Sequence, residues 1–545
     1  MKKEQNAFTL VELLAVIVIL AIVLIIAVPG VLSIINKTKD NALDRQLDMI
    51  KEAAKHYMMV ESDHVKWIDH TTTYLSLDLL KHGGYLDKKV LNPQTKQEIT
   101  CMNTKVTKTG KNYQYEVMEC PTSSSFTESL PNAPRLGSGM IPIVYKDGNW
   151  VKANSTNQNN TWYNYDAQEW ANVAIVTEDV RQALLEAPEG TVVPMDQIKM
   201  MLVWIPRFEY RLFNVDGTVS PVGNENMDGD YLVSLRFSQV YEPKVDGRRN
   251  SEWLTHPAFT LENQELEGFW VGKFEMGFDG ATNGTEAEQD IVDSTKIITK
   301  PNVYSWRSVV YSRIYKNIMG LKNTGTLFGI TSTEDPHMIK NMEWGAMTYL
   351  TQSRYGKAGN SNYVGVEKQV RINNNKQYIT GCGADAQDAV GGNDCYSYDT
   401  ANGQTASTTG NISGVYDTSG GSWEATGSVL LLNNQNDGIP SYSEFQTDEL
   451  ASIIKENKYL TIYSYSNDKA EYSRGHLGDA TLEMGPFYEL YNAWYGDVAQ
   501  MIWNESRWFV RGNTSYNDPQ RNGITSFGSW YGGVSVYVTS RVVFI

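Results

Sequence analysis

The feature that most constrains this chain is an uncharged apolar run near its amino terminus. Residues 13–36 contain no charged side chain, and they follow a short polar leader that holds Lys2 and Lys3. A helix of this length is long enough to cross the hydrocarbon core of a membrane. A secretory signal peptide has its cleavage site after the apolar run, whereas here the small residue Ala7 precedes it. Cleavage after Ala7 would leave the apolar helix on the mature protein, with Phe8 as its first residue.

Two residues of this segment are unusual for a simple anchor. Glu12 lies at the edge of the expected helix, where an isolated carboxylate is costly and usually marks a functional partner. Pro29 removes a backbone donor and predicts a kink or local melting of the helix. The alternative is an ordinary single-span anchor in which the glutamate has no special role.

Ala7, the sequence FTLVE at residues 8–12 and Pro29 resemble the class III leader of type IV prepilins and pseudopilins. That family more often has glycine at the cleavage position, so Ala7 departs from it. The resemblance implies cleavage after Ala7 by prepilin peptidase, methylation of the new amino terminus at Phe8, and pairing of Glu12 with the amino terminus of a neighbouring subunit. It also implies that the helix resides in membrane lipid before it joins other pilin subunits, where such an ion pair would fix register.

The same helix is expected to continue to about residue 60 and to carry a small head at residues 61–120. Apolar residues recur at helical spacing and favour a domain packed along one face: Ile35, Leu43, Leu47, Ile50, Ala54 and Tyr57. Residues 75–86 predict a short helix that ends at Gly83 and Gly84. Residues 98–107 and 111–120 predict two strands around a turn at Gly110. This arrangement resembles the compact head of Gram-positive pilin-like proteins.

Length and charge bound the rest of the chain. With 545 residues it is too long for one core, so we expect at least two domains. Its 47 basic and 63 acidic residues give a net charge of −16, which argues against nucleic-acid binding as the main function. Residues 121–137 are rich in Ser, Thr and Pro and predict an exposed linker, so residues 138–545 would form the second large domain.

The four cysteines are expected to form two disulfides. Cys101 and Cys120 would join the two strands of the small head, and Cys382 and Cys395 would close a loop rich in Gly, Asp and Asn. Each would stabilise the fold by roughly 3 kcal/mol. A zinc site is the alternative, but no CxxC motif or histidine cluster supports it.

A second set of motifs lies between about residue 140 and the carboxyl terminus. The segment GVYDTSGGSWEAT, residues 414–426, resembles a motif of the formylglycine-generating enzyme family, a variant of the C-type lectin fold; Gly421 and Ala425 depart from that motif. Similar segments follow the family's order: MLVWIPRFEY at 201–210, GFWVGKFEMG at 268–277, Glu343 and Trp344, WFVRGNTSY at 508–516, and SRVVF at 540–544. The resemblance implies an irregular, loop-rich domain.

The same motifs give no sign of catalysis. The oxidase members of that family use a cysteine pair in the carboxyl-terminal part, but no cysteine follows Cys395. Iron-dependent relatives use a site rich in histidine, whereas His256 and His476 are isolated and predict packed or loop positions. We expect no catalytic residue and no cofactor or metal site, and we interpret the central motif residues as core: Tyr416, Asp417, Trp423 and Glu424.

Calcium is an open alternative. Residues 224–230, NENMDGD, offer oxygen ligands at alternate positions, but Leu235 stands where an EF-hand would need glutamate. A hairpin turn is the simpler interpretation of this segment. Residues 278–284, FDGATNG, are equally ambiguous.

The carboxyl-terminal tail, residues 508–545, is the expected ligand surface. In lectin-like receptors of this family, including the variable proteins of diversity-generating retroelements, the corresponding strands and loops bind the ligand. Aromatic residues interleaved with small polar ones also resemble the composition of an antibody paratope. The predicted ligand-binding residues are Tyr516, Asn517, Asn522, Phe527, Trp530, Tyr531 and Tyr537. The alternative is that this stretch is only loop and core.

Together these patterns predict an α+β protein: a long amino-terminal transmembrane pilin helix with a small α+β head, then a large C-type lectin-like domain. The expected function is that of a minor type IV pilin-like protein, anchored by one span and then displayed on a filament of a Gram-positive bacterium. Its large domain would bind a glycan or a protein and not nucleic acid, with a tail that is diversified or fixed. The alternatives are a pseudopilin of a type II secretion-like or DNA-uptake machine, and an enzyme on the same fold.

Overall fold

The computed structural model describes residues 42–60, 72–82, 84–119, 131–212, 233–240, 253–432, 441–465, 478–481, 496–514 and 522–545, with gaps at 88, 94, 97, 98, 100, 101, 111, 263, 364, 385–391 and 457. The chain divides into two compact units, residues 1–127 and 128–545. Both units mix helices and strands, and much of the larger one is irregular. Within the described residues no helix is both long and apolar enough to cross a membrane. The predicted span at residues 13–36 lies outside them.

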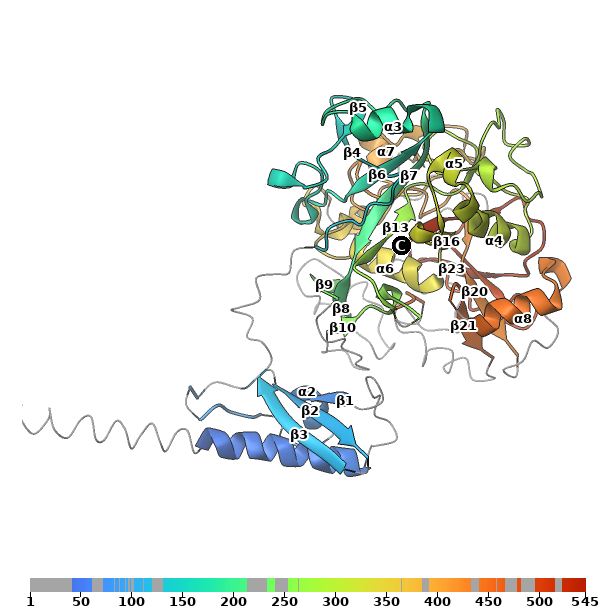
Figure 1. Ribbon diagram of the computed structural model, residues 1–545. Helices are drawn as coiled ribbons and strands as arrows, with labels where there is room; N and C mark the ends of the chain where they lie inside the picture. Colours follow the sequence, from blue (N-terminus) through green and yellow to red (C-terminus); the bar gives the residue numbers. More distant parts are fainter. Residues whose placement is uncertain are drawn as a thin grey trace, which may run out of the picture. The chain divides into compact units, whose positions relative to one another are not determined.

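The small unit packs a helix against a three-stranded antiparallel sheet (Figure 1). The helix covers residues 42–60, and the other elements are β1 (Thr72–Ser76), α2 (Leu77–His82), β2 (Met102–Thr109) and β3 (Asn112–Glu119). The predicted apolar stripe is confirmed from Leu47 onward, because Ile50 and Ala54 are fully buried and cluster with Val106 of β2. Ile35, its first residue, lies outside the described part of the chain. The predicted hairpin is also confirmed: β2 pairs with β3 around Gly110, whose φ of +62° suits glycine. Strand β1 was not predicted.

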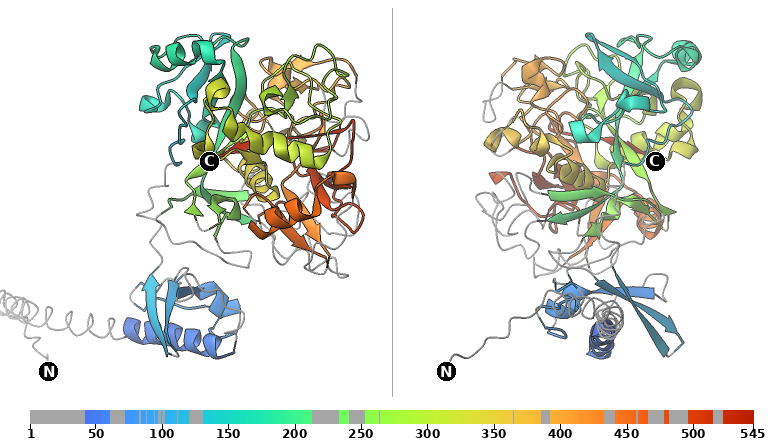
Figure 2. Two further views of the ribbon diagram at one scale, coloured as in Figure 1. Left: turned by 45° about the vertical axis from the view of Figure 1, so that its right-hand side comes forward. Right: turned by 90° about the vertical axis from the view of Figure 1, so that its left-hand side faces the viewer.

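The large unit contains a seven-stranded antiparallel sheet (Figures 1 and 2). Its order is β16 (His337–Met338), β25 (Val542–Phe544), β13 (Gly268–Gly272), β7 (Ile198–Pro206), β6 (Asn172–Val176), β4 (Ile141–Lys146) and β5 (Asn149–Lys152). Strand β7, IKMMLVWIP, is apolar except for Lys199, and it lies in the middle of the sheet with almost every residue buried. The last strand of the chain, β25, pairs with β13, so the carboxyl terminus completes this sheet.

A second sheet has four strands, three of which come from the tail. Its order is β23 (Phe527–Trp530), β22 (Trp508–Arg511), β19 (Trp423–Ala425) and β24 (Val538–Ser540). Strand β19 comes from the motif at residues 414–426 and lies between two tail strands, antiparallel to β22 and parallel to β24. The motif and the tail therefore form one structural element, although about 80 residues separate them in the sequence.

Short strands and helices complete the large unit. The remaining strands are β8 (Phe208–Leu212), β9 (Val233–Phe237), β10 (Leu254–Thr255), β11 (Thr260–Leu261), β12 (Gln264–Glu265), β14 (Gly277–Phe278), β15 (Ile297–Ile298), β17 (Cys382–Gly383), β18 (Tyr396–Ser397), β20 (Ser428–Leu431) and β21 (Thr461–Ser464). The α-helices are α3 (Glu178–Glu186), α4 (Tyr311–Met319), α5 (Gly325–Phe328), α6 (Asn341–Thr351), α7 (Ala401–Gln404) and α8 (Thr447–Glu456).

The prediction of an exposed linker at residues 121–137 is wrong for residues 131–137. Residues 131–137 pack onto the large unit, where Asn132 is buried and its side-chain amide donates to the carbonyls of Ser238 and Glu267. The indole N–H groups of the buried Trp204 and Trp270 donate to the carbonyls of Asn132 and Arg135. Buried indole groups need acceptors, and this segment supplies them.

Candidate functional site

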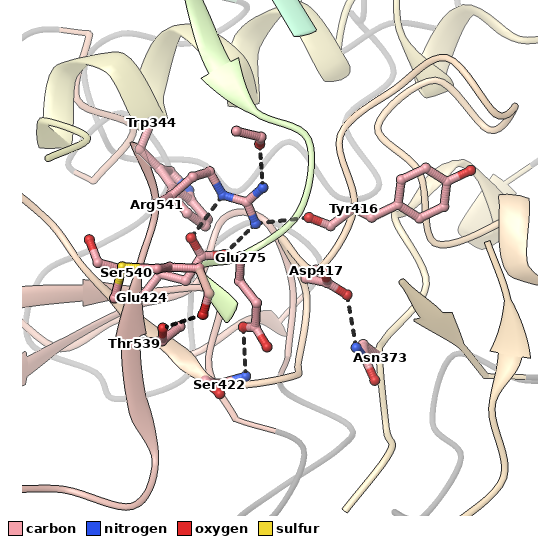
Figure 3. A network of polar contacts seen from close by, with 12 residues as sticks. Glu275, Trp344, Asn373, Tyr416, Asp417, Ser422, Glu424, Thr539, Ser540 and Arg541 are labelled. Atoms are coloured by element: carbon pink, nitrogen blue, oxygen red, sulfur yellow. Dashed lines mark hydrogen bonds and ion pairs between the residues drawn. The ribbon is translucent and has the colours of Figure 1, made fainter. Parts of the chain in front are cut away.

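The motif at residues 414–426 meets the last strands of the chain around one buried ion pair (Figure 3). Arg541, just before β25, donates from Nε to Glu424 Oε2 at 2.8 Å and from Nη2 to Glu424 Oε1 at 2.5 Å. Its other guanidinium bonds go to the carbonyl oxygens of Gly272 at 2.7 Å and Tyr416 at 2.8 Å. Both side chains are fully buried. This single arginine therefore joins β13, the motif and both sheets.

Two further carboxyl groups lie in the same centre. Asp417 accepts hydrogen bonds from the Asn373 side-chain amide at 2.8 Å and the Gly381 N–H at 2.9 Å. Glu275 accepts from the Ser422 N–H at 3.1 Å. Gly420 and Gly421 have φ of +73° and +67°, and a Cβ at Gly420 would lie 2.4 Å from the carbonyl oxygen of Asn373. Glycine is therefore required for this close approach.

Burial controls the charge of this centre. Burial raises the pKa of Glu275 well above its usual value, and repulsion from Asp417 and Glu424 adds to the effect. Burial likewise raises the pKa of Asp417, and it raises the pKa of Glu424 to about 7 although Arg541 opposes the shift. Burial and these neighbours therefore favour the protonated form of Glu275. The centre is closed to solvent and binds its own strands together, which is a structural role.

The helix α6 carries the Glu-Trp pair predicted on a helix. Glu343 caps its first turn by accepting the Lys340 N–H at 2.7 Å, and it also contacts His337 Nε2 at 2.9 Å. Trp344 is fully buried and donates from its indole nitrogen to the Ile524 carbonyl at 2.8 Å. The buried His337–Glu343 pair was not predicted. Burial opposes protonation of His337, but Glu343 and the Asp335 carbonyl together raise its pKa.

The structure corrects the predicted ligand residues of the tail. Asn522, Phe527 and Trp530 are 1%, 2% and 5% exposed, so the expectation that they face a ligand is wrong. Phe527 and Trp530 supply apolar packing to the core. Tyr537 is half-buried, and Tyr531 is 41% exposed. The composition of the tail did not separate its core face from its outer face because both contain aromatic residues.

Two exposed tyrosines of the large unit lie against each other. Tyr442 is 64% exposed, and its ring meets that of Tyr531 edge-on with centroids 5.5 Å apart. Tyr531 donates from its hydroxyl to the Val534 carbonyl at 3.3 Å, which holds the ring in place. Tyrosines fixed in this way can make large contacts at a low cost in conformational entropy. Tyr442 was not predicted, since it lies outside the tail.

One family model matches the chain. Residues 2–28 match the model described as the prokaryotic N-terminal methylation motif. The chain carries a prepilin-type amino-terminal segment. This segment implies processing by prepilin peptidase, anchoring in the membrane and assembly with other pilin subunits. No curated protein matches the chain.

Several predicted residues lie outside the part of the chain that the structure describes. The prepilin-type residues Ala7, Phe8, Glu12 and Pro29 are among them, as are Cys101, Cys120, Tyr516, Asn517, His476 and residues 224–230. Cys382 and Cys395 do form a disulfide, with Cα atoms 4.7 Å apart.

Within the described residues, no group of three or more His, Cys, Asp and Glu side chains could hold a metal ion. In the segment 278–284, Asp279 pairs with Lys199 at 2.5 Å.

His256 is fully buried: its Nδ1 accepts the Ala258 N–H and its Nε2 contacts the Gly478 carbonyl. Burial lowers the pKa of His256 to about 3, so the ring is neutral and packed in the core, as predicted.

Proposed function

We propose that this protein is a minor pilin whose large carboxyl-terminal unit is an adhesive head on the surface of a Gram-positive bacterium. The observation that carries the proposal is the prepilin-type segment at residues 2–28 in the same chain as a separate unit of residues 128–545. That unit is far larger than the small one. Packing it on every subunit of a filament would be sterically difficult, which favours a minor subunit, for example at the tip.

The large unit is proposed to be a formylglycine-generating-enzyme-like variant of the C-type lectin fold. Three of the segments that resemble this family support the proposal because they meet at one place. GFWVGKFEMG supplies β13 and Glu275, the motif at residues 414–426 supplies Glu424, and SRVVF supplies Arg541 and β25. Segments that resemble successive parts of one fold would be expected to share its core.

We propose that this unit binds a ligand and does not catalyse a reaction. The only two cysteines of the large unit, Cys382 and Cys395, are joined in a disulfide, so they offer no free thiol for cysteine oxidase chemistry. The buried carboxyl groups of the centre hold their own strands. Calcium is not required in this proposal. The exposed Tyr442 and Tyr531 provide the surface for the ligand.

The proposal is tested with cells that display the full chain. Tyr442 and Tyr531 are changed together to Ala, and adhesion to host cells and to immobilised glycans or proteins is compared with that of native cells. We expect adhesion to fall at least tenfold while surface labelling of the protein is unchanged. Equal adhesion by native and variant cells would reject the binding surface. Native cells that adhere no better than cells lacking the protein would reject the adhesive head.

A pseudopilin of a secretion or DNA-uptake machine is the second candidate, because the methylation motif is shared by pilins and pseudopilins. Loss of secretion or transformation in a deletion strain, with adhesion intact, would favour it.

A further inference from the structure

An exposed apolar face lies where three segments of the large unit meet, and we call it the Tyr442 face. Its side chains are 39% to 64% exposed and belong to Ile291, Val292, Tyr442, Tyr531, Val534 and Val536. Contiguous exposed apolar side chains are uncommon on soluble domains and mark interaction surfaces. Only Tyr531 was predicted to contact a ligand.

The three segments are held together around the start of α4. The Tyr311 N–H donates to the Gly532 carbonyl at 2.9 Å, and the Val310 N–H donates to Asp290 Oδ1 at 3.1 Å. Arg313 then bridges Asp290 at 2.6 Å and Glu444 at 2.8 Å. These contacts hold the segments 290–292, 442–444 and 531–536 next to one another at the start of α4.

The face is pre-organised for binding. A Cβ placed on Gly533 would lie 2.4 Å from Cε2 of Tyr531 and 3.5 Å from Cβ of Tyr442. The ring of Tyr531 thus rests directly on the glycine backbone, and Tyr442 packs beside it. Surfaces that are ordered before binding lose less conformational entropy when a partner docks.

The charged groups beside the Tyr442 face indicate the charge expected of its partner. Arg313 is shared between two carboxylates, so these three groups carry a net charge of −1. Residues 1–127 contain 15 basic and 14 acidic residues, a net charge of +1, which leaves 32 basic and 49 acidic residues and a net charge of −17 for residues 128–545. Electrostatic complementarity therefore favours a basic partner.

The aliphatic side chains narrow the class of partner. Ile291, Val292, Val534 and Val536 offer no hydrogen bonds, so a glycan placed over them would lose water from its hydroxyl groups without compensation. An apolar protein surface gains free energy when it covers the same side chains. We propose that the Tyr442 face docks a protein partner whose apolar side chains are flanked by Lys or Arg. This inference rests on the proposed adhesive function and narrows its ligand to a protein.

The test uses the full chain in detergent micelles and a phage-displayed library of random 12-residue peptides. We expect the enriched peptides to combine aromatic or aliphatic residues with Lys or Arg. A synthetic copy of an enriched peptide should bind Val534→Lys at least tenfold more weakly than the native chain. Val192→Lys is the matched control, because Val192 is 48% exposed and Val534 is 51% exposed. Both variants add the same charge, and circular dichroism checks that both are folded.

The control variant should bind within twofold of the native chain. Enrichment of acidic or uncharged peptides, or an equal loss of binding in both variants, would overturn the inference. A glycan array is probed in parallel. Binding to glycans that Val534→Lys abolishes, without peptide enrichment, would reject a protein ligand but keep the adhesive head. Peptide or glycan binding that Val534→Lys leaves unchanged would reject the Tyr442 face alone, and no binding to any peptide or glycan would reject both the face and the adhesive head.

Discussion

The buried ion pair predicts a large loss of stability when Arg541 is changed to Met. Methionine fills much of the space but leaves Glu424 without a cation and leaves the carbonyl groups of Gly272 and Tyr416 without their donors. Removing one partner of a buried ion pair costs about 3–5 kcal/mol. Each unsatisfied carbonyl adds about 1–3 kcal/mol where water cannot reach it. We therefore expect the free energy of unfolding of the large unit to fall by at least about 4 kcal/mol.

The loss should also depend on pH. Burial raises the pKa of Glu424 to about 7 in the native chain, and removal of the guanidinium raises it further. A raised carboxyl pKa destabilises the folded state as the pH rises from the usual value of about 4.3 to the folded value. In the native chain the contribution of Glu424 to the free energy of unfolding levels off near pH 7, whereas in the Arg541→Met variant this contribution continues to fall. The difference between the two proteins should widen by about 1 kcal/mol between pH 5.5 and pH 8.

Equilibrium unfolding in urea, followed by tryptophan fluorescence, measures this loss. Thirteen of the 14 tryptophans lie in residues 128–545, so the signal reports the large unit. Arg313→Met is the matched control, because Arg313 also forms ion pairs with carboxylates, those of Asp290 and Glu444, but is 29% exposed. Exposed ion pairs contribute about 0–1 kcal/mol. A loss in Arg541→Met no greater than that in Arg313→Met would refute the structural role of the buried centre.

Three further predictions concern the disulfide, the buried His256 and the prepilin-type segment. Cys382→Ser opens the loop closed by Cys395, a separation of 13 residues, and should lower the free energy of unfolding by roughly 3 kcal/mol; urea curves with and without reductant measure this, and native protein insensitive to reductant would contradict it. Burial lowers the pKa of His256 to about 3, so the native chain should lose stability as the pH falls below about 6.5. The His256→Asn variant should show a shallower dependence of its urea midpoint on pH between 7 and 5, and an identical slope would contradict the assignment. Ala7→Arg should block processing, so intact mass spectrometry of the membrane fraction should find residues 1–7 retained and Phe8 unmethylated; a processed variant would place the cleavage site elsewhere.

Patterns in the sequence predicted those helices and hairpins that form between residues close together along the chain. The apolar stripe at helical spacing predicted the packed face of the helix at residues 42–60, and the turn at Gly110 predicted the hairpin of β2 and β3. These features depend on backbone geometry and periodicity, which nearby residues determine.

Tertiary structure decided the features that join distant residues. The ion pair between Arg541 and Glu424 spans 117 positions, and sequence spacing alone cannot show that two such side chains share a buried site. The burial of Trp530 and the exposure of Tyr531 also depend on how β23 packs. Successive side chains at the end of a strand point to opposite faces of the sheet, and only the packing decides which face is buried. The sequence by itself determined that the chain carries a prepilin-type segment, since that segment acts through composition and order along the chain. Only the folded large unit determined which aromatic residues remain at its surface, because burial is a property of packing between segments.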